Sequence, residues 1–412
     1  MLRARSTRQQ GEPVEDRRFP MSRAEGRPFD PAPELKRRAE EDPVSRVKLW
    51  DGGTPWLITR YEDVRAALAD PRVSVDATCP AFPHTNAVSK ARDTTMKTLM
   101  QMDAPEHTVQ RRLLSPEFTI EKMAALRPRI QRIVDDLIDG MLDGPQPVDL
   151  VAAFALPAPT QVICELLGVP YADRGFFQGV AHTLVMDEPD PGKAVAASED
   201  LNGYLEQLVV HKNAEPGEDL LSTLAVEQFR TGAMTPREIA TLGQLLLVAG
   251  HDTTASMIAL GTAALLANPD QLDLVRDGDP ARVAGAVEEL LRYLSITHTE
   301  ARRVAREDLE IGGRLVRAGE GIVAVKSTAN RDPAAFPDPD SVDVRREARH
   351  HVAFGHGRHV CLGAPLARVE LQVVYGTLFR RIPTLKSAIP LEELKFDENA
   401  VFYTVRELPV TW

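Results

Sequence analysis

A single cysteine near the C-terminus stands in a glycine-rich run that could hold a metal-bound thiolate. The run Phe354–Gly363 reads F-G-H-G-R-H-V-C-L-G, and a helix-like stretch begins directly after it at Ala364-Pro365. Glycine lets the backbone approach a flat partner where a side chain would clash. The free N–H groups at the start of a helix favour the anionic form of a nearby cysteine. Cys361 therefore suits the role of an axial thiolate ligand of haem iron, which favours O–O bond cleavage.

Four consecutive polar residues interrupt a long apolar helix pattern elsewhere in the chain. The helix is expected to start at Thr235-Pro236, where Glu238 completes a capping box, and to stop before Asn268-Pro269. It would hold roughly 32 residues and extend about 48 Å. The interruption is His251–Thr254. Threonine and aspartate loosen a helix locally, and a buried carboxylate is costly unless it is paired or functional. The alternative is a polar helix face that points to solvent.

Both sequences resemble motifs of the cytochrome P-450 superfamily. F-G-x-G-x-H-x-C-x-G resembles its haem-binding signature, and the alternative is a buried structural cysteine beside a glycine turn. A-G-H-D-T-T at 249–254 resembles the oxygen-activation motif of its long central helix. The resemblance implies that haem b, iron protoporphyrin IX, lies between that helix and the cysteine-bearing helix. By this match the cofactor-binding residues in the two motifs are Ala249, Gly250, Phe354, His359, Cys361 and Gly363.

The resemblance also implies roles for the polar residues of the long helix. Thr253 would hydrogen-bond the oxygen that is activated at the iron, and Asp252 would relay protons from solvent. Cleavage of the O–O bond requires protons at the distal oxygen, and a hydroxyl can orient the water that delivers them. The small residues Ala249 and Gly250 would leave room for dioxygen. His251 has no assigned role.

Haem carries two propionates, which need cationic or N–H partners when they are partly buried. His107 and Arg111 lie at i and i+4 on a predicted helix, and Arg303 lies on a segment that resembles the strand of the family's propionate arginine. His359 precedes the cysteine by two residues. Each of these residues alone is more often a surface charge than a ligand. Because all four residues match the family in their order along the chain, we expect them to bind the haem propionates together.

A third motif is structural. Glu289 and Arg292 are spaced i, i+3, so both side chains lie on one helix face. Alone, this pattern indicates a surface salt bridge. In this chain it resembles the family's E-x-x-R pair, and Arg346 matches the spacing of the third member. The three residues would fix the loop before Cys361.

Composition limits the class of protein. The chain has 412 residues, of which 43% are hydrophobic and 26% charged, as in an ordinary globular protein. No apolar run approaches a membrane span of roughly 18 residues. The net charge of −11 disfavours nucleic acid as a partner. Because Cys79, Cys164 and Cys361 are widely spaced, a disulfide framework or a cysteine-rich zinc site is not expected.

The expected fold class is mainly α with a minor β portion. Segments Val44–Trp50 and Pro55–Thr59 predict two strands joined by a tight turn, and Tyr61–Ala69 predicts a helix. Helical patterns dominate from Pro105 to Leu294. Residues 1–18 are polar, without a signal or an anchor, and are expected to form a disordered leader. Residues 19–412 would then form one domain of a monomeric, cytoplasmic protein.

Segment Ser74–Thr98 shows little periodicity and predicts a long functional loop. The resemblance makes it one of five segments expected to line the substrate site. The set is Ser74–Thr98, Phe176–Asp190, Leu245–Thr253, Leu294–Glu300 and Val401–Phe402. Most of their residues are apolar, so the expected substrate is an apolar small molecule such as a polyketide, a terpenoid or a drug-like compound.

The leading functional hypothesis is a haem-thiolate monooxygenase that hydroxylates or epoxidises this substrate with dioxygen. Electrons would come from a ferredoxin with its reductase, because the chain has no dinucleotide fingerprint. Arg112 and Arg358 would form its basic docking patch. One alternative is a haem-thiolate nitric oxide reductase or peroxygenase, against which Asp252-Thr253 argues. A haem sensor or carrier is the non-enzymatic alternative, although no signalling module is evident.

Overall fold

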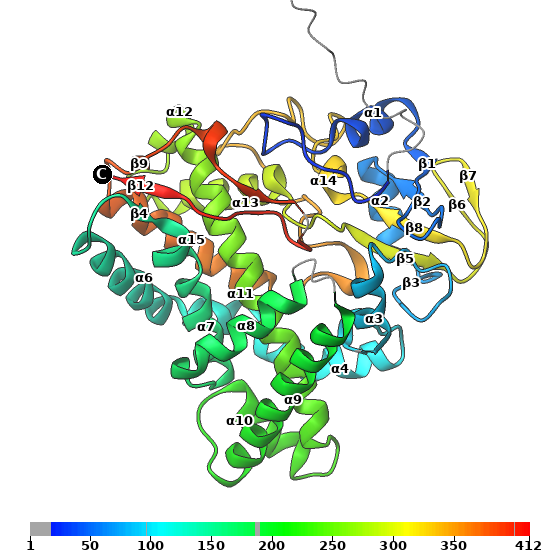
Figure 1. Ribbon diagram of the computed structural model, residues 1–412, viewed down its shortest axis with the longest axis horizontal. Coiled ribbons are helices and arrows are strands. Elements are labelled where there is room, and N and C mark those ends of the chain that lie inside the picture. Colours follow the sequence, from blue (N-terminus) through cyan, green and yellow to red (C-terminus); the bar gives the residue numbers. More distant parts are fainter. Residues whose placement is uncertain (1–17, 96, 186–189, 399) are drawn as a thin grey trace, which may run out of the picture.

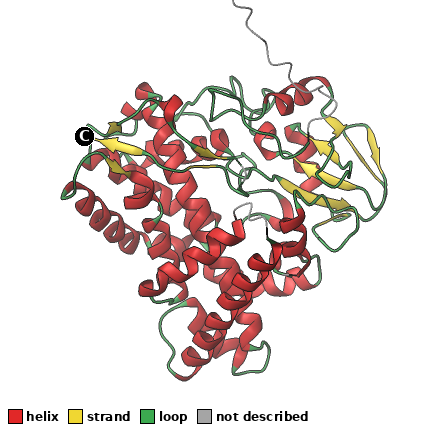
Figure 2. Ribbon diagram, in the orientation of Figure 1, coloured by secondary structure: helices red, strands yellow, loops and turns green. Residues whose placement is uncertain are grey.

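Helices form most of the chain, and short strands gather mainly at one end of it (Figure 2). The computed structural model describes residues 18–95, 97–185, 190–398 and 400–412. The α-helices are α1 Pro33–Glu41, α2 Tyr61–Ala69, α3 Ala87–Thr95, α4 Glu106–Leu114, α5 Ile120–Ala125, α6 Arg127–Leu142, α7 Pro157–Leu167, α8 Arg174–Val185, α9 Pro191–Ala214, α10 Leu220–Leu224, α11 Pro236–Leu266, α12 Pro269–Asp273, α13 Pro280–Leu294, α14 Lys326–Ala329 and α15 Ala364–Arg381. This content confirms the expected fold class.

The largest sheet has the strand order β1-β2-β8-β5-β3. Its strands are β1 Val44–Arg46, β2 Trp56–Ile58, β3 Val73–Ser74, β5 Ala301–Ala305 and β8 Gly321–Ala324. Strands β1 and β2 are antiparallel, with Val44 opposite Ile58, which confirms the predicted strand pair. The smaller sheets contain β4 Val148–Asp149, β6 Leu309–Ile311, β7 Arg314–Val316, β9 Lys386–Ser387, β10 Phe396–Asp397, β11 Thr404–Val405 and β12 Pro409–Thr411.

The predicted long helix is α11, which runs through the helical part of the molecule (Figure 1). Its capping box is present: the Thr235 side chain accepts from the Glu238 N–H, and the Thr235 N–H donates to the Glu238 carboxylate at 2.7 Å. Residues 254–265 are buried on all sides, so this half of α11 is a core helix.

Helix α15, which follows the cysteine loop, packs directly against α11. The Tyr375 hydroxyl of α15 donates to the Met257 carbonyl of α11 at 2.5 Å. A Cβ at Gly261 would lie 2.0 Å from the Tyr375 hydroxyl oxygen, so only glycine lets the helices approach this closely. This contact sets the position of the cysteine loop relative to the polar interruption in α11.

Segment Ser74–Thr98 contains more regular structure than its lack of periodicity predicts. It includes the helix α3, so the expectation of one continuous loop was wrong. The helix begins after Asn86, whose side-chain carbonyl accepts from the Ser89 N–H at 2.7 Å. Such a cap stabilises a short helix whose apolar pattern is weak.

Several sequence-based expectations fall partly on residues that lie outside the described ranges. Residues 1–17 of the expected leader are among them, whereas Arg18 forms a β-bridge with Lys48. The same holds for residue 96 in segment Ser74–Thr98 and for residues 186–189 in segment Phe176–Asp190.

Candidate active site

The cysteine loop folds back on itself so that Cys361 lies at the start of α15. The Cys361 N–H donates to the Phe354 carbonyl at 2.9 Å, which closes the loop. Gly355 and Gly357 have φ values of 78° and 72°, in the region that favours glycine. A Cβ at Gly357 would also lie 2.5 Å from the Leu68 carbonyl oxygen of α2. Gly355 and Gly357 are therefore needed for this loop conformation, and Gly357 also for its packing on α2.

Cys361 is accessible, but its thiol is also partly enclosed by neighbouring residues. Cys361 is exposed to solvent, yet burial raises the pKa of its thiol. The amides of Gly363 and Ala364 at the start of α15 act in the opposite direction, as do the charges of Arg111 and Lys326. Since burial prevails, the anionic form needs a further positive charge at the sulfur. A metal ion bound there would supply it.

Three of the predicted propionate partners come together beside the cysteine loop. The rings of His107 and His359 lie 4.2 Å apart between centroids. Burial, together with the smaller effect of the positive charge of Arg303, lowers the pKa of His359 to about 3. The imidazole is therefore neutral at neutral pH.

Two of these groups have hydrogen-bonding capacity to spare. Within the described part of the chain, the buried Nε2 of His359 has no partner, and Arg303 forms no ion pair. Among the residues that the structure describes, the Arg303 guanidinium donates only to the Arg302 carbonyl, at 2.8 Å. Unpaired donors at a buried site indicate an acceptor that completes it. Carboxylates such as the propionates of haem fit these donors.

The three arginines near the loop differ in their exposure. Arg111 is half-buried on α4 and donates to the Val360 carbonyl at 2.8 Å, so it fastens α4 to the residue before Cys361. Arg112 is exposed on the same helix. Arg358 is half-buried, and its charge lowers the pKa of Asp70 after the larger contribution of Arg72. The two residues predicted to dock a redox partner thus lie on the elements that hold the cysteine, α4 and the cysteine loop.

In the polar interruption of α11, the side chains of the adjacent residues His251 and Asp252 contact each other. His251 is buried, and its Nε2 lies 3.1 Å from Oδ1 of Asp252. Burial raises the pKa of the Asp252 carboxyl, whereas the charges of His251 and His182 lower it. Within the described residues, Nδ1 of His251 and Oδ2 of Asp252 have no partner. Sequence reasoning left His251 without a role, and the structure makes it the neighbour of the predicted proton relay.

The hydroxyl of Thr253 donates to the Ala249 carbonyl at 2.8 Å, one turn earlier in α11. Its oxygen keeps free lone pairs that can accept a hydrogen bond from water. Gly250 has a packing requirement, because a Cβ there would lie 3.0 Å from the Ile163 side chain of α7. The missing side chain thus makes room for α7.

The predicted structural triad is assembled, with Glu289 and Arg292 fully buried and Arg346 half-buried. Arg292 donates two hydrogen bonds to Glu289, at 2.7 and 2.8 Å, and both side chains are 0% exposed. The Nε of Arg346 donates to the same carboxylate at 3.2 Å. Arg292 also donates to the carbonyls of Asn330 and Pro339, both at 2.8 Å. The triad therefore fixes the segment that leads to the cysteine loop.

Sequence reasoning missed two buried charged residues near this site, Glu300 and Lys326. Lys326 follows the fully buried strand β8 after one further buried residue, Val325. A lysine at the end of an apolar strand was the available signal, because lysine is seldom fully buried without a partner.

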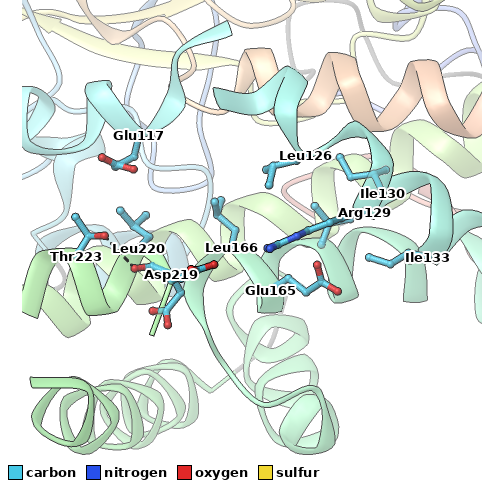
Figure 3. Close-up of a pocket in the computed structure, with 12 residues that line it drawn as sticks. Glu117, Leu126, Arg129, Ile130, Ile133, Glu165, Leu166, Asp219, Leu220 and Thr223 are labelled. Carbon is cyan, nitrogen blue, oxygen red and sulfur yellow. Dashed lines mark hydrogen bonds between the residues drawn. The ribbon is translucent and has the colours of Figure 1, made fainter. Parts of the chain in front are cut away.

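A separate pocket of about 120 Å³ lies between α6, α7 and α10 (Figure 3). Its floor is apolar and includes Ile130 and Leu166, and its rim carries Arg129 and Glu165. None of the predicted site residues lines it. Among the described residues, no group of three or more His, Cys, Asp or Glu side chains could hold a metal ion. In the same residues, no helix combines the length and apolar character needed to cross a membrane.

Comparisons with known proteins agree with this geometry. The Cytochrome P450 family profile matches residues 283–385, a range with the triad, Arg303 and Cys361. The chain is 50% identical to Cytochrome P450 GfsF of Streptomyces halstedii over 98% of both chains. The crystal structure of GfsF covers 96% of this chain and 100% of its own, with a TM-score of 0.90.

Two further solved structures carry bound small molecules. CYP105P1 in complex with filipin I is 44% identical, with a TM-score of 0.87 and coverage of 95% and 98%. The mycinamicin VIII C21 methyl hydroxylase MycCI of Micromonospora griseorubida, bound to mycinamicin VIII, is 38% identical, with a TM-score of 0.89 and coverage of 96% and 99%. Full-length identity near 50%, together with the cysteine loop and the structural triad, shows that this chain belongs to the cytochrome P450 family and is a monooxygenase with a haem-iron cofactor.

Proposed function

We propose that this P450 monooxygenase hydroxylates or epoxidises an apolar small molecule with haem b, dioxygen and electrons from a ferredoxin. One observation carries the proposal: an accessible thiol sits beside unpaired donors on Arg303 and His359, which suits a metal cofactor with carboxylate groups. When bound, haem supplies the activation of dioxygen and the insertion of one oxygen atom into the substrate.

The chain would hold haem b from two sides. Cys361 would ligate the iron, and the amides of Gly363 and Ala364 would hydrogen-bond its sulfur. Arg303 and His359 would donate to the propionates, with the ring of His107 in tilted contact with that of His359 and Arg111 hydrogen-bonded to the loop. Phe354 would support the thiolate, because its carbonyl holds the Cys361 N–H. Ala249 would form the facing surface of α11, with Gly250 next to it, where the missing side chain makes room for α7.

Proton delivery would depend on Asp252 and Thr253. Burial raises the pKa of Asp252, so its carboxyl can carry and release a proton closer to neutral pH than an exposed aspartate. His251 holds one carboxylate oxygen, which leaves Oδ2 to exchange protons with water. Thr253, anchored to the Ala249 carbonyl, would accept a hydrogen bond from that water and orient it.

The proposed substrate class rests on two kinds of support. Leu245–Thr253 and Val401–Phe402, two of the segments expected to line the site, are mostly apolar, and two similar proteins carry filipin I and mycinamicin VIII in their solved structures. The second of these proteins is named as a methyl hydroxylase. Hydroxylation of an aliphatic carbon in a polyketide or terpenoid, or in a compound of similar size, is the reaction we propose.

The carbon monoxide difference spectrum of the reduced protein tests the assignment of Cys361. Thiolate ligation should give the strongly red-shifted Soret band, and Cys361→His should lose it even if haem stays bound. Cys164 is buried in α7 and Cys79 is half-buried in a loop, so Cys164→Ser and Cys79→Ser are matched controls that should keep the band. A band that persists in Cys361→His would refute the assignment.

A further inference from the structure

Lys326 is a buried lysine at the end of the main sheet. Only 9% of it is exposed, and it is the first residue of the short helix α14, separated from β8 by Val325 alone. Its neighbours in the strand, Ile322, Val323 and Ala324, are fully buried apolar residues. An ammonium group in such a position loses its hydration, and the protein must compensate for that loss.

The described part of the chain gives the ammonium little compensation. Its Nζ donates to the hydroxyl of Thr297 at 3.1 Å, and no carboxylate among the described residues lies within 4.0 Å of it. Glu300 is the carboxylate that raises the pKa of Lys326, but its oxygens accept from the backbone N–H groups of Lys326 at 2.7 Å and Ser327 at 3.2 Å. An ammonium has three donors, so two of them remain for another acceptor.

The charges around Lys326 also indicate that its ammonium group is poorly compensated. Burial lowers the pKa of Lys326, and the positive charge of Arg303 adds to that effect, while Glu300 and Cys361 raise it. A carboxylate placed at the free donors would relieve this cost, since a buried charge is stable only when it is paired and hydrogen-bonded.

The ammonium lies where substrate is expected. Thr297 belongs to segment Leu294–Glu300, and it forms an antiparallel bridge with Phe402 of segment Val401–Phe402. Both segments are expected to line the substrate site. The mutual influence of Lys326 and Cys361 on their pKa values further indicates that the lysine lies near the cysteine loop.

The segment that carries Thr297 is held in a specific conformation. Ser295 and Glu300, which flank it, have φ values of 39° and 52°, a region that residues other than glycine rarely adopt. Such strain persists only where the surrounding structure enforces it, and it gathers at ligand sites. The hydrogen bonds from α14 to Glu300 enforce it here, so Thr297 is held against Lys326.

We infer that the ammonium of Lys326 binds a carboxylate of the substrate, so this enzyme selects an apolar molecule that bears one acidic group. The inference rests on the proposed function. A haem propionate is the other possible source of a carboxylate at this site. Arg303 and His359 already offer unpaired donors for the propionates, so the substrate is the source we favour.

Imidazoles with a carboxyalkyl tail test this inference, because the imidazole anchors the probe at the iron whatever the natural substrate is. We would use ω-(imidazol-1-yl)alkanoic acids of five to eleven methylenes, the primary amides of equal length, and 1-butylimidazole as a tail-free probe. Dissociation constants come from the Soret shift. At the best length the acid should bind about 10-fold more tightly than its amide, as expected for a hydrogen bond between charged groups.

Variants of Lys326 assign this preference to the lysine. Lys326→Met should reduce the ratio of acid to amide affinity to about 1 and leave 1-butylimidazole unaffected, because the remaining contacts are apolar. Lys326→Arg should retain a preference for the acid. Lys386→Met, at an exposed lysine of β9, should behave as the wild type.

Three outcomes would overturn the inference: no preference for the acid at any length, a preference that survives in Lys326→Met, or faster haem transfer from Lys326→Met to apomyoglobin. The last result would assign the lysine to a propionate. Failure of the proposed function is distinguishable, since the purified protein would then hold no haem and 1-butylimidazole would give no Soret shift.

Discussion

The guanidinium of Arg302 on β5 lies 2.9 Å from the carboxylate of Asp93 on α3, measured from Nη1 to Oδ2. Arg92 donates to the same carboxylate at 3.0 Å and to the Leu184 carbonyl of α8 at 2.7 Å. Asp93 is almost fully buried. One carboxylate therefore ties segment Ser74–Thr98, expected to border the substrate, to the end of α8 and to the strand that carries the proposed propionate arginine.

Asp93→Asn should loosen this part of the molecule. Burial opposes the charged form of Asp93, but its arginine neighbours prevail and hold the pKa of the carboxyl well below its usual range. Removing the charge leaves two guanidinium groups without their counter-ion, at a cost of about 3–5 kcal/mol when such a pair is buried. Urea unfolding should show the lost stability, and hydrogen exchange should accelerate in α3 before it does in α13.

Asp70→Asn is the matched control. Asp70 pairs with Arg72 at 2.6 Å, but this pair is partly exposed, so its loss should cost about 1 kcal/mol or less. Equal exchange rates in α3 of the wild type and Asp93→Asn would contradict the proposed anchoring role.

Thr253→Ala should separate electron consumption from product formation. The variant should keep the helix, because within the described ranges the lost hydroxyl bonds only to the Ala249 carbonyl, and substrate binding should stay unchanged. Water near the reacting oxygen loses its orientation, so a larger share of the electrons should reduce dioxygen to hydrogen peroxide instead of forming product. Asp252→Asn removes the titrating group and should slow turnover by about 10²-fold, as expected for the loss of a general acid.

Product and peroxide yields per electron measure this effect. Thr254→Ala is the control, because Thr254 is equally part of α11 and is buried, yet it is not proposed to face the reacting oxygen. Unchanged coupling in Thr253→Ala would argue against the assigned role of Thr253.

Features determined by local sequence were predictable. The capping box at Thr235 and Glu238 defined the start of α11, since both partners lie within one turn of helix. The cysteine loop was recognisable because its backbone needs glycine at positions where few other residues fit. One example is Gly357, which approaches α2 closely.

Features that depend on contacts between distant residues were not predictable. Asp93 meets Arg302 across 209 positions, and no periodicity marks that pairing. Helix α3 was missed because a cap at Asn86 and tertiary contacts stabilise it in place of an amphipathic pattern. The contact of His251 with Asp252 joins neighbours in sequence, but it needs the side-chain directions that only the folded helix fixes.

Glu288 should contribute to acid stability. Burial opposes its ionisation, but contacts with His351 and Arg368 prevail and lower the pKa of Glu288 to about 2, from an ordinary value of about 4.5. Because the folded-state pKa is depressed, the stabilisation is complete above about pH 4.5 and is lost as the pH falls toward 2. It is on the order of 3 kcal/mol at neutral pH.

Urea titrations between pH 2 and pH 7 measure this contribution. Glu288→Gln should be less stable at pH 7 and should lose less stability on acidification than the wild type. The exposed Glu310 of β6 provides the control, since Glu310→Gln should change stability by about 0.5 kcal/mol or less. Parallel pH curves for the wild type and Glu288→Gln would contradict the prediction.

Arg112→Glu should slow electron delivery from the ferredoxin. Arg112 is exposed on α4, the helix that Arg111 fastens to the cysteine loop, and Arg358 lies in that loop. A basic surface there would steer an acidic carrier, and such steering raises association rates by about 10-fold or more at low salt. Charge reversal should therefore slow reduction of the iron and flatten its dependence on ionic strength, because salt screens exposed charges.

Stopped-flow reduction at several salt concentrations measures this effect, with Arg129→Glu as the control. Arg129 is also exposed, but it lies on α6 at the separate pocket, whose lining includes no residue of α4 or of the cysteine loop. Its reversal changes the net charge equally and should leave both the rate and its salt dependence unchanged. Substrate affinity should stay constant in both variants. Rapid reduction of the iron by a nicotinamide cofactor alone would refute the need for a carrier, and it would favour the nitric oxide reductase alternative.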